Sequence, residues 1–90
     1  MDIGFDEGKR RINLAKHGLD LADARRIFAG IHIDQLDDRF DYGEDRYITA
    51  GMLGPDVVIC VWADWVDVKR IISRRRATAD EQKAYFESFA

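Results

Sequence analysis

The chain has 90 residues, of which 47% are hydrophobic and 34% charged, and its formal net charge is −3. This composition is too apolar for a disordered chain, and the length suits one domain with a thin core, so we expect a single domain over residues 1–90. The lone cysteine, Cys60, excludes an internal disulfide, and the apolar run around it predicts a small core residue.

Nothing in the sequence predicts contact with a membrane. Residues 1–6 lack the basic and apolar regions of a signal peptide. The longest apolar run is far shorter than the roughly 20 residues that a spanning helix needs. We therefore expect a cytoplasmic protein.

The first 30 residues predict a short strand followed by two helices. The strand covers residues 2–5, and a helix of about three turns follows, with Asp6 as its N-cap and Gly18 as its stop. Asp20 is the expected N-cap of a second helix that ends at Gly30. The apolar sides of this helical hairpin need a sheet to cover.

From residue 31 the hydrophobic period changes to two, which predicts strands over residues 31–36, 46–53, 57–63 and 66–75. Thr78 and Glu81 then have the spacing of a capping box, which predicts a short C-terminal helix. The expected fold is α+β: an N-terminal helical hairpin packed on an antiparallel sheet of about four strands, with a short C-terminal helix.

Charge is unevenly distributed along the chain. Residues 34–68 hold nine acids against two bases, whereas residues 69–90 hold six bases against three acids, and five of the cations lie within Lys69–Arg76. So dense a basic run suits an anionic partner. Two alternatives stay open: a strand end whose cations pair with acids elsewhere, or self-association between this run and the acidic residues 34–45.

The sequence contains no P-loop, nucleophile elbow or C-x-x-C motif, and two histidines are too few for a histidine-rich metal site. We expect neither a metal nor a cofactor. What remains is a set of charged residues at the ends of predicted elements, each of which also has an ordinary structural explanation. They are His17 at a helix C-terminus, Glu44 and Arg46 at a strand start, and Arg70, Arg74 and Arg75 in the last strand.

Considered together, these residues resemble the BrnT toxin family in order and over nearly the whole chain. The matching positions are Phe5-Asp6, Lys9, Asn13, Lys16-His17-Gly18, Ala24, Phe28, Gly43-Glu44-x-Arg46, Arg70-Ile71-Ile72-Ser73-x-Arg75-x-Ala77, Glu81 and Tyr85. The family often has a tryptophan before the residue that matches Asp6, and a small residue at the position of Arg74.

The resemblance implies a RelE-like ribonuclease fold and a toxin of a type II toxin–antitoxin system that cleaves RNA and inhibits translation. It further implies a cognate ribbon-helix-helix, BrnA-like antitoxin. Two toxins and an antitoxin dimer would form a hetero-oligomer that neutralises the toxin and represses the operon. Operator DNA would then be contacted only through the antitoxin.

RNA cleavage without a metal needs a proton acceptor for the attacking 2′-hydroxyl, a proton donor for the leaving oxygen, and cations on the phosphate. The expected catalytic residues are His17, Glu44, Arg46, Arg70 and Arg75, with proton transfer assigned to Glu44 or His17. Lys16, Ser73, Arg74 and Arg76 are the expected additional RNA-phosphate contacts.

Two questions stay open at this point. A bulge in the last strand would reverse its alternation, so the sequence leaves undecided whether Arg70 and Arg75 share a face. The rival function is a non-catalytic binding or co-repressor module that acts only through its antitoxin partner, which the net acidity favours.

Overall fold

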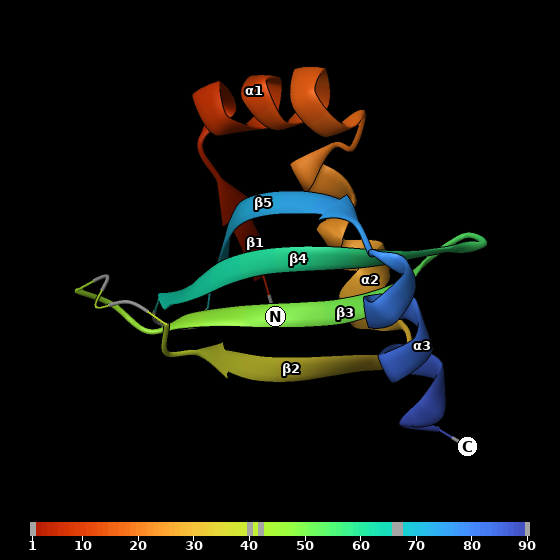
Figure 1. The fold of residues 1–90 in the computed structure, drawn as a ribbon. Coiled ribbons are helices and arrows are strands. Elements are labelled where there is room, and N and C mark those ends of the chain that lie inside the picture. The colour runs from red at the N-terminus through yellow and green to blue at the C-terminus, as the bar shows by residue number, and fades with distance from the viewer. Residues whose placement is uncertain (1, 40, 42, 66–67, 90) are drawn as a thin grey trace.

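The computed structural model describes residues 2–39, 41, 43–65 and 68–89. Along the chain lie β1 (Asp2–Phe5), α1 (Glu7–His17), the 3₁₀ turn η1 (Leu21–Asp23), α2 (Ala24–Ala29), β2 (His32–Asp37), β3 (Arg46–Leu53), β4 (Asp56–Trp65), β5 (Val68–Arg76) and α3 (Ala79–Glu87) (Figure 1). The predicted α+β class is confirmed.

The sheet differs from the prediction at one edge. Its five strands lie in the order β1-β5-β4-β3-β2. The pairs from β2 to β5 are antiparallel, as expected, but β1 pairs in parallel with β5, with Ile3 opposite Lys69 and Phe5 opposite Ile71. The sheet is therefore mixed. Ile3 and Phe5 pack against the core beside β5, which explains why this short strand joins that edge.

The first helix begins and ends as predicted. The Asp6 side chain accepts a hydrogen bond from the backbone N–H of Gly8 at 2.7 Å. Gly18 closes the helix at φ +67°, a left-handed conformation that favours glycine. The capping box of α3 is also confirmed, because Thr78 and Glu81 each bond the other's backbone N–H.

The second helix is shorter than predicted. Asp20 caps the 3₁₀ turn η1 rather than an α-helix, and α2 contains only six residues before it ends at Gly30. The Asp20 carboxylate also accepts two hydrogen bonds from Arg10 of α1, at 2.8 and 2.9 Å. This bidentate pair lowers the pKa of Asp20 to about 2 and ties the turn to α1.

The strand boundaries follow the alternation closely. β3 has its predicted bounds, and β4 continues through Asp64 and Trp65, where a connection was expected. The predicted start of the last strand at residues 66–67 lies outside the described residues, and β5 is described from Val68.

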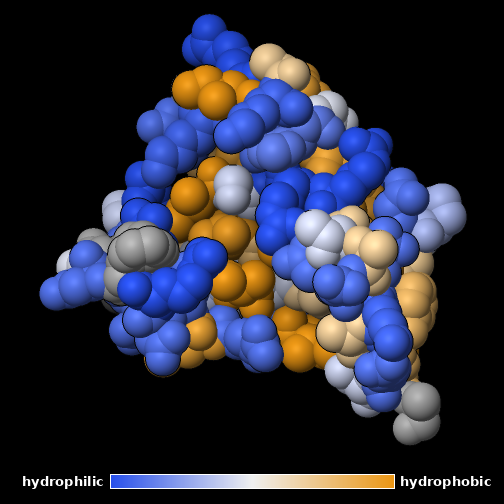
Figure 2. Space-filling view, viewed as in Figure 1, coloured by the Kyte–Doolittle hydropathy of each residue, from blue (hydrophilic) through white to orange (hydrophobic). Residues whose placement is uncertain are grey.

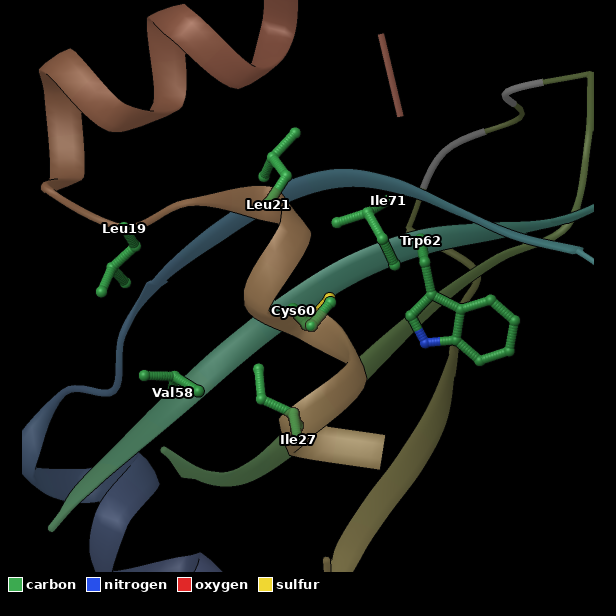
Figure 3. Close-up of a cluster of buried hydrophobic side chains, with 8 residues drawn as sticks. Leu19, Leu21, Ile27, Val58, Cys60, Trp62 and Ile71 are labelled. Atoms are coloured by element: carbon green, nitrogen blue, oxygen red, sulfur yellow. The ribbon is translucent and has the colours of Figure 1, made fainter. Parts of the chain in front are cut away.

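The two faces of the sheet have separate cores. On one, which we call the helix face, Val58, Cys60 and Trp62 of β4 pack under Leu21 and Ile27 (Figure 3). Cys60 is fully buried there, as predicted, and burial raises the pKa of its thiol to about 12.

On the other face, which we call the open face, α3 covers only one end. Val57 and Ile59 of β4 pack there against Ala77 and Tyr85. In the view of Figure 2, apolar surface lies in the middle of the molecule with hydrophilic side chains around it. Part of this surface is a groove beside α3 that includes Ile48 and Ile59. The open face therefore has apolar side chains at its centre and polar side chains around them.

A bulge in β5 decides which side chains reach each face. Ile71 pairs with Trp62 and Ser73 pairs with Val61, so Ile72 has no partner on β4. Directly opposed residues share a face of a sheet. The extra residue therefore reverses the alternation between the first and second halves of β5.

The second half of β5 has a free edge that α1 closes. β1 pairs only as far as Ile71, so within the described chain residues 72–76 have no strand on that side. Asn13 of α1 accepts a hydrogen bond from the backbone N–H of Arg74 at 3.0 Å and donates one to the carbonyl of Leu19 at 2.8 Å. One buried amide thus satisfies both the strand edge and the loop after the helix.

We expect Asn13→Ala to lower the free energy of unfolding by about 2 kcal/mol, because it leaves a buried N–H and a buried C=O without partners. Urea unfolding followed by circular dichroism measures this loss. Leu14→Ala, on the exposed side of the same helix, serves as the control and should cost much less. Equal losses in the two variants would contradict the role given to Asn13.

Candidate functional site

Four of the predicted site residues lie on the open face, three of them on β5 and one on β3. Arg46 and Arg70 both lie opposite Ala63 of β4, one from each side. Ser73 pairs with Val61, and Arg75 pairs with Ile59 of the open-face core. Regular alternation would have put Arg70 and Arg75 on opposite faces, so the extra residue is what brings them to the same one.

One end of this face carries a compact polar cluster around Trp65. The Trp65 indole N–H donates to Glu44 Oε2 at 3.0 Å, and Arg46 Nε donates to Glu44 Oε1 at 3.4 Å. The guanidinium of Arg70 lies 4.6 Å from the centroid of the Trp65 ring. This cation–π contact uses the flat side of the guanidinium and leaves its N–H edge available to an anion.

These contacts set the protonation state of Glu44. The indole N–H lowers the pKa of its carboxyl most, and Arg46 and Arg70 lower it further. Glu44 is therefore a carboxylate at neutral pH, with both oxygens accepting hydrogen bonds. A carboxyl with a lowered pKa is a poor general acid, and its two hydrogen bonds hold Trp65 and Arg46 in place.

Arg75 lies at the opposite end of the same face and is tied to α3. Its two terminal nitrogens donate to the two carboxylate oxygens of Glu81 at 2.7 and 2.9 Å. The hydrogen bond from Arg75 lowers the pKa of Glu81 to about 2. Because the folded pKa is depressed, the stability from this pair is present at neutral pH and is lost as the pH falls from about 4.5 to about 2.

Lys16, His17 and Ser73 line a hollow between α1 and the bulge, apart from the groove beside α3. Lys9, Asn13 and Ile72 also line it. His17 is half-buried, and its backbone carbonyl accepts a hydrogen bond from Arg76 at 3.2 Å. This places the end of α1 beside the Arg75–Arg76 end of β5, so the structure does not bring His17 together with Glu44.

Arg74 lines neither the groove beside α3 nor the hollow between α1 and the bulge. It pairs with Cys60 and is fully buried on the helix face, where it donates to the carbonyl of Asp20 and lies 4.0 Å from Asp23. Burial lowers the pKa of its guanidinium, although arginine stays protonated even then. The structure therefore does not place Arg74 where the predicted contact with RNA phosphate requires it, since its side chain is fully buried.

Sequence reasoning missed Trp65, which was assigned to a connection. It is 52% exposed at the end of β4 and links Glu44 to Arg70. The spacing of the two tryptophans could have identified it. Trp62 and Trp65 are three positions apart on one strand, so they lie on opposite faces of the sheet. Trp62 serves the core, which leaves Trp65 on the face with the cations.

We expect Trp65→Phe to raise the pKa of Glu44, because phenylalanine keeps a ring under Arg70 but donates no hydrogen bond. A carboxyl-carbon NMR titration measures this shift directly. Phe86→Leu, which changes an exposed ring on α3, should leave the Glu44 titration unchanged. An unaltered Glu44 pKa in Trp65→Phe would disprove the link between the two side chains.

The described part of the chain has no helix of the length and apolarity that crossing a membrane requires. It also contains no group of three or more His, Cys, Asp or Glu side chains placed to hold a metal ion.

Comparison with known proteins identifies the family of this chain but no individual relative. No curated protein matches the sequence. A family model described as "Ribonuclease toxin, BrnT, of type II toxin-antitoxin system" matches residues 5–81. The match includes the strand end with Arg46, the whole of β5 with its bulge, and Glu81. The chain belongs to the BrnT family of ribonuclease toxins.

Proposed function

We propose that this chain is a metal-independent endoribonuclease that binds single-stranded RNA along β5 on the open face, in the manner expected of a RelE-like toxin. The observation that carries the proposal is the bulge at Ile72, which aligns Arg70, Ser73 and Arg75 on one face. A row of cations over an apolar floor suits a strand with exposed phosphates and unstacked bases.

The dimensions of this row support binding of more than one nucleotide. Arg70 and Arg75 pair with Ala63 and Ile59, four positions apart on β4. At about 3.3 Å per residue, the two strand positions are about 13 Å apart. Trp65 at one end offers a half-exposed ring for a base, and base–aromatic stacking contributes about 1–3 kcal/mol per base.

His17 is the residue we assign to proton transfer. It shares a hollow with Lys16 and Ser73, next to the end of β5 that carries Arg75. Glu44 is less suited, since both of its oxygens already accept hydrogen bonds.

The reaction forms a bond from the 2′-oxygen to phosphorus and breaks the bond from phosphorus to the 5′-oxygen. The 2′-hydroxyl proton passes to His17, and the 5′-oxygen takes a proton from water. The hydroxide that remains takes the proton from His17, which returns the histidine to its neutral form. Arg75 and Lys16 stabilise the charge that develops on the phosphate. The products are a 2′,3′-cyclic phosphate and a free 5′-hydroxyl.

Cleavage of this kind would inhibit translation in the cell, and a type II system supplies a protein antitoxin to prevent it. We propose a ribbon-helix-helix, BrnA-like antitoxin that binds the toxin in a complex of two toxins and one antitoxin dimer. In that complex the antitoxin contacts operator DNA. Co-expression with the neighbouring small reading frame, followed by mass measurement of the purified complex, tests both its identity and its stoichiometry.

The purified protein should cleave RNA in the presence of EDTA and leave 2′,3′-cyclic phosphate ends. A matched oligonucleotide with a single 2′-deoxy sugar at the cleaved position should resist, because the attacking hydroxyl is missing. His17→Ala should slow cleavage about 100-fold or more, as loss of a proton-transfer residue does. RNA binding without cleavage would favour the rival co-repressor module instead.

Arg75 and Glu81 allow the cation to be tested apart from the ion pair. Both Arg75→Ala and Glu81→Gln remove the pair, but only the first removes the cation. We expect Arg75→Ala to lower kcat/KM about 100-fold, as loss of one charge-stabilising donor does, while Glu81→Gln stays active. Equal losses in both variants would show that the pair supports the fold and that Arg75 does not act on RNA.

A further inference from the structure

The helix face has a second polar cluster that the proposed ribonuclease site does not use. A hollow of about 390 Å³ is lined by Ile3, Arg25, Phe28, Ala29, His32 and Lys69. Its size lies within the range of about 300–1,000 Å³ typical of small-ligand sites. Two of the six lining residues are cations and none is a carboxylate, although the chain as a whole is acidic.

Lys69 is held in the hollow by aromatic rings. Its ammonium lies 3.6 Å from the ring centroid of Trp62 and 4.9 Å from that of Phe28. Cation–π contacts hold the charge in place without neutralising it. Lys69 and Arg70 are neighbours in the chain, yet one lies over Trp62 on the helix face and the other over Trp65 on the open face.

His32, which lines the hollow, lies next to Asp34, which does not line it, and the two side chains form a pair of hydrogen-bond acceptors. Phe28 contacts the His32 ring edge-on, with centroids 5.4 Å apart. His32 Nδ1–H donates to the carbonyl of Gly30 at 2.9 Å, so in the neutral ring Nε2 carries only a lone pair. Nε2 lies 3.8 Å from Asp34 Oδ2, which is also an acceptor. The two atoms together suit a ligand group that donates hydrogen bonds, such as an amino group or a sugar hydroxyl.

Asp34 is fixed in this position by a hydrogen-bond chain from the core. The Trp62 indole N–H donates to Thr49 Oγ1 at 2.8 Å, and the Thr49 hydroxyl donates to Asp34 Oδ1 at 2.5 Å. Thr49 is fully buried, so the chain is anchored inside the protein. This chain of hydrogen bonds fixes the orientation of the Asp34 carboxylate, and with it the position of Oδ2.

We propose that this hollow is a nucleotide-binding site, separate from the RNA-cleaving face. The phosphate binds Lys69 and Arg25, the base packs on the apolar wall that includes Ile3, and an amino or hydroxyl group donates to His32 and Asp34. The nucleotide is either a free mononucleotide or one residue of a bound RNA. The site does not depend on the proposed ribonuclease activity.

The test measures binding of 5′-AMP, 5′-UMP, inorganic phosphate and a short RNA by calorimetry and by tryptophan fluorescence. Trp65→Phe leaves Trp62 as the remaining tryptophan, and its ring touches Lys69, so its emission reports on this hollow. We expect saturable binding of at least one nucleotide. A change in Trp62 emission with mononucleotides identifies a free ligand, whereas a change with RNA alone identifies a strand, because Trp62 lies on the helix face and does not report on RNA at the open face.

The neighbouring cations supply a matched pair of variants. Lys69→Met keeps an apolar contact with Trp62 and should weaken nucleotide binding about 10- to 100-fold, the effect of losing a charge-assisted hydrogen bond. Arg70→Met should leave the binding of mononucleotides unchanged, and any loss of RNA binding or cleavage in it concerns the open face. Arg25→Gln, on the exposed surface of α2, repeats the test without touching the core.

Three results would overturn the proposal. They are the absence of any saturable nucleotide binding, equal affinity for phosphate and nucleotides, and equal weakening by Lys69→Met and Arg70→Met.

Discussion

The one extra residue in β5 determines how the charge of this protein is used. If Ile72 were paired like its neighbours instead of bulged, strict alternation would send Arg70 and Arg75 to opposite faces, and the open face would lose one of them. With it, the first half of the strand presents Lys69 inward under the helices and Arg70 outward, and the second half presents Arg74 inward and Arg75 outward. A single strand therefore supplies cations to both sides of the sheet. Bulges commonly re-aim side chains next to functional sites in this way.

Much of the fold could be predicted because its signals are local. Capping at Asp6 and Thr78, the glycine stop at Gly18 and the alternation of β3 depend on residues close in sequence, and each was confirmed. The parallel pairing of β1 could not be predicted, because its partner lies at the far end of the chain. The shortened α2 also escaped prediction, since the side chain of Asp20 serves a tertiary pair with Arg10 as well as a cap.

The site was predictable to the extent that alternation holds. Glu44 and Arg46 were both expected at one strand start, and the structure shows them hydrogen-bonded to each other. The burial of Arg74 could not be predicted, because charge density in a sequence does not show how deep a side chain lies, and only the register with β4 places it against Cys60. Its buried guanidinium has two nitrogens, Nε and Nη2, without hydrogen-bond partners among the described residues. Burying an arginine with unpaired nitrogens costs free energy. In return, Arg74 fixes η1 against the sheet through its hydrogen bond to Asp20.

The carboxylate of Glu81 serves two structures at once. One oxygen, Oε1, accepts from the backbone of Thr78 to begin α3, and the same oxygen accepts from Arg75 on the open face. The two functions are thermodynamically linked. Any anion that takes the guanidinium from Glu81 also removes a restraint on α3, and any partner that draws α3 away releases a cation onto the face. The affinity of this surface for anions and the docking of its last helix therefore oppose each other through a single side chain.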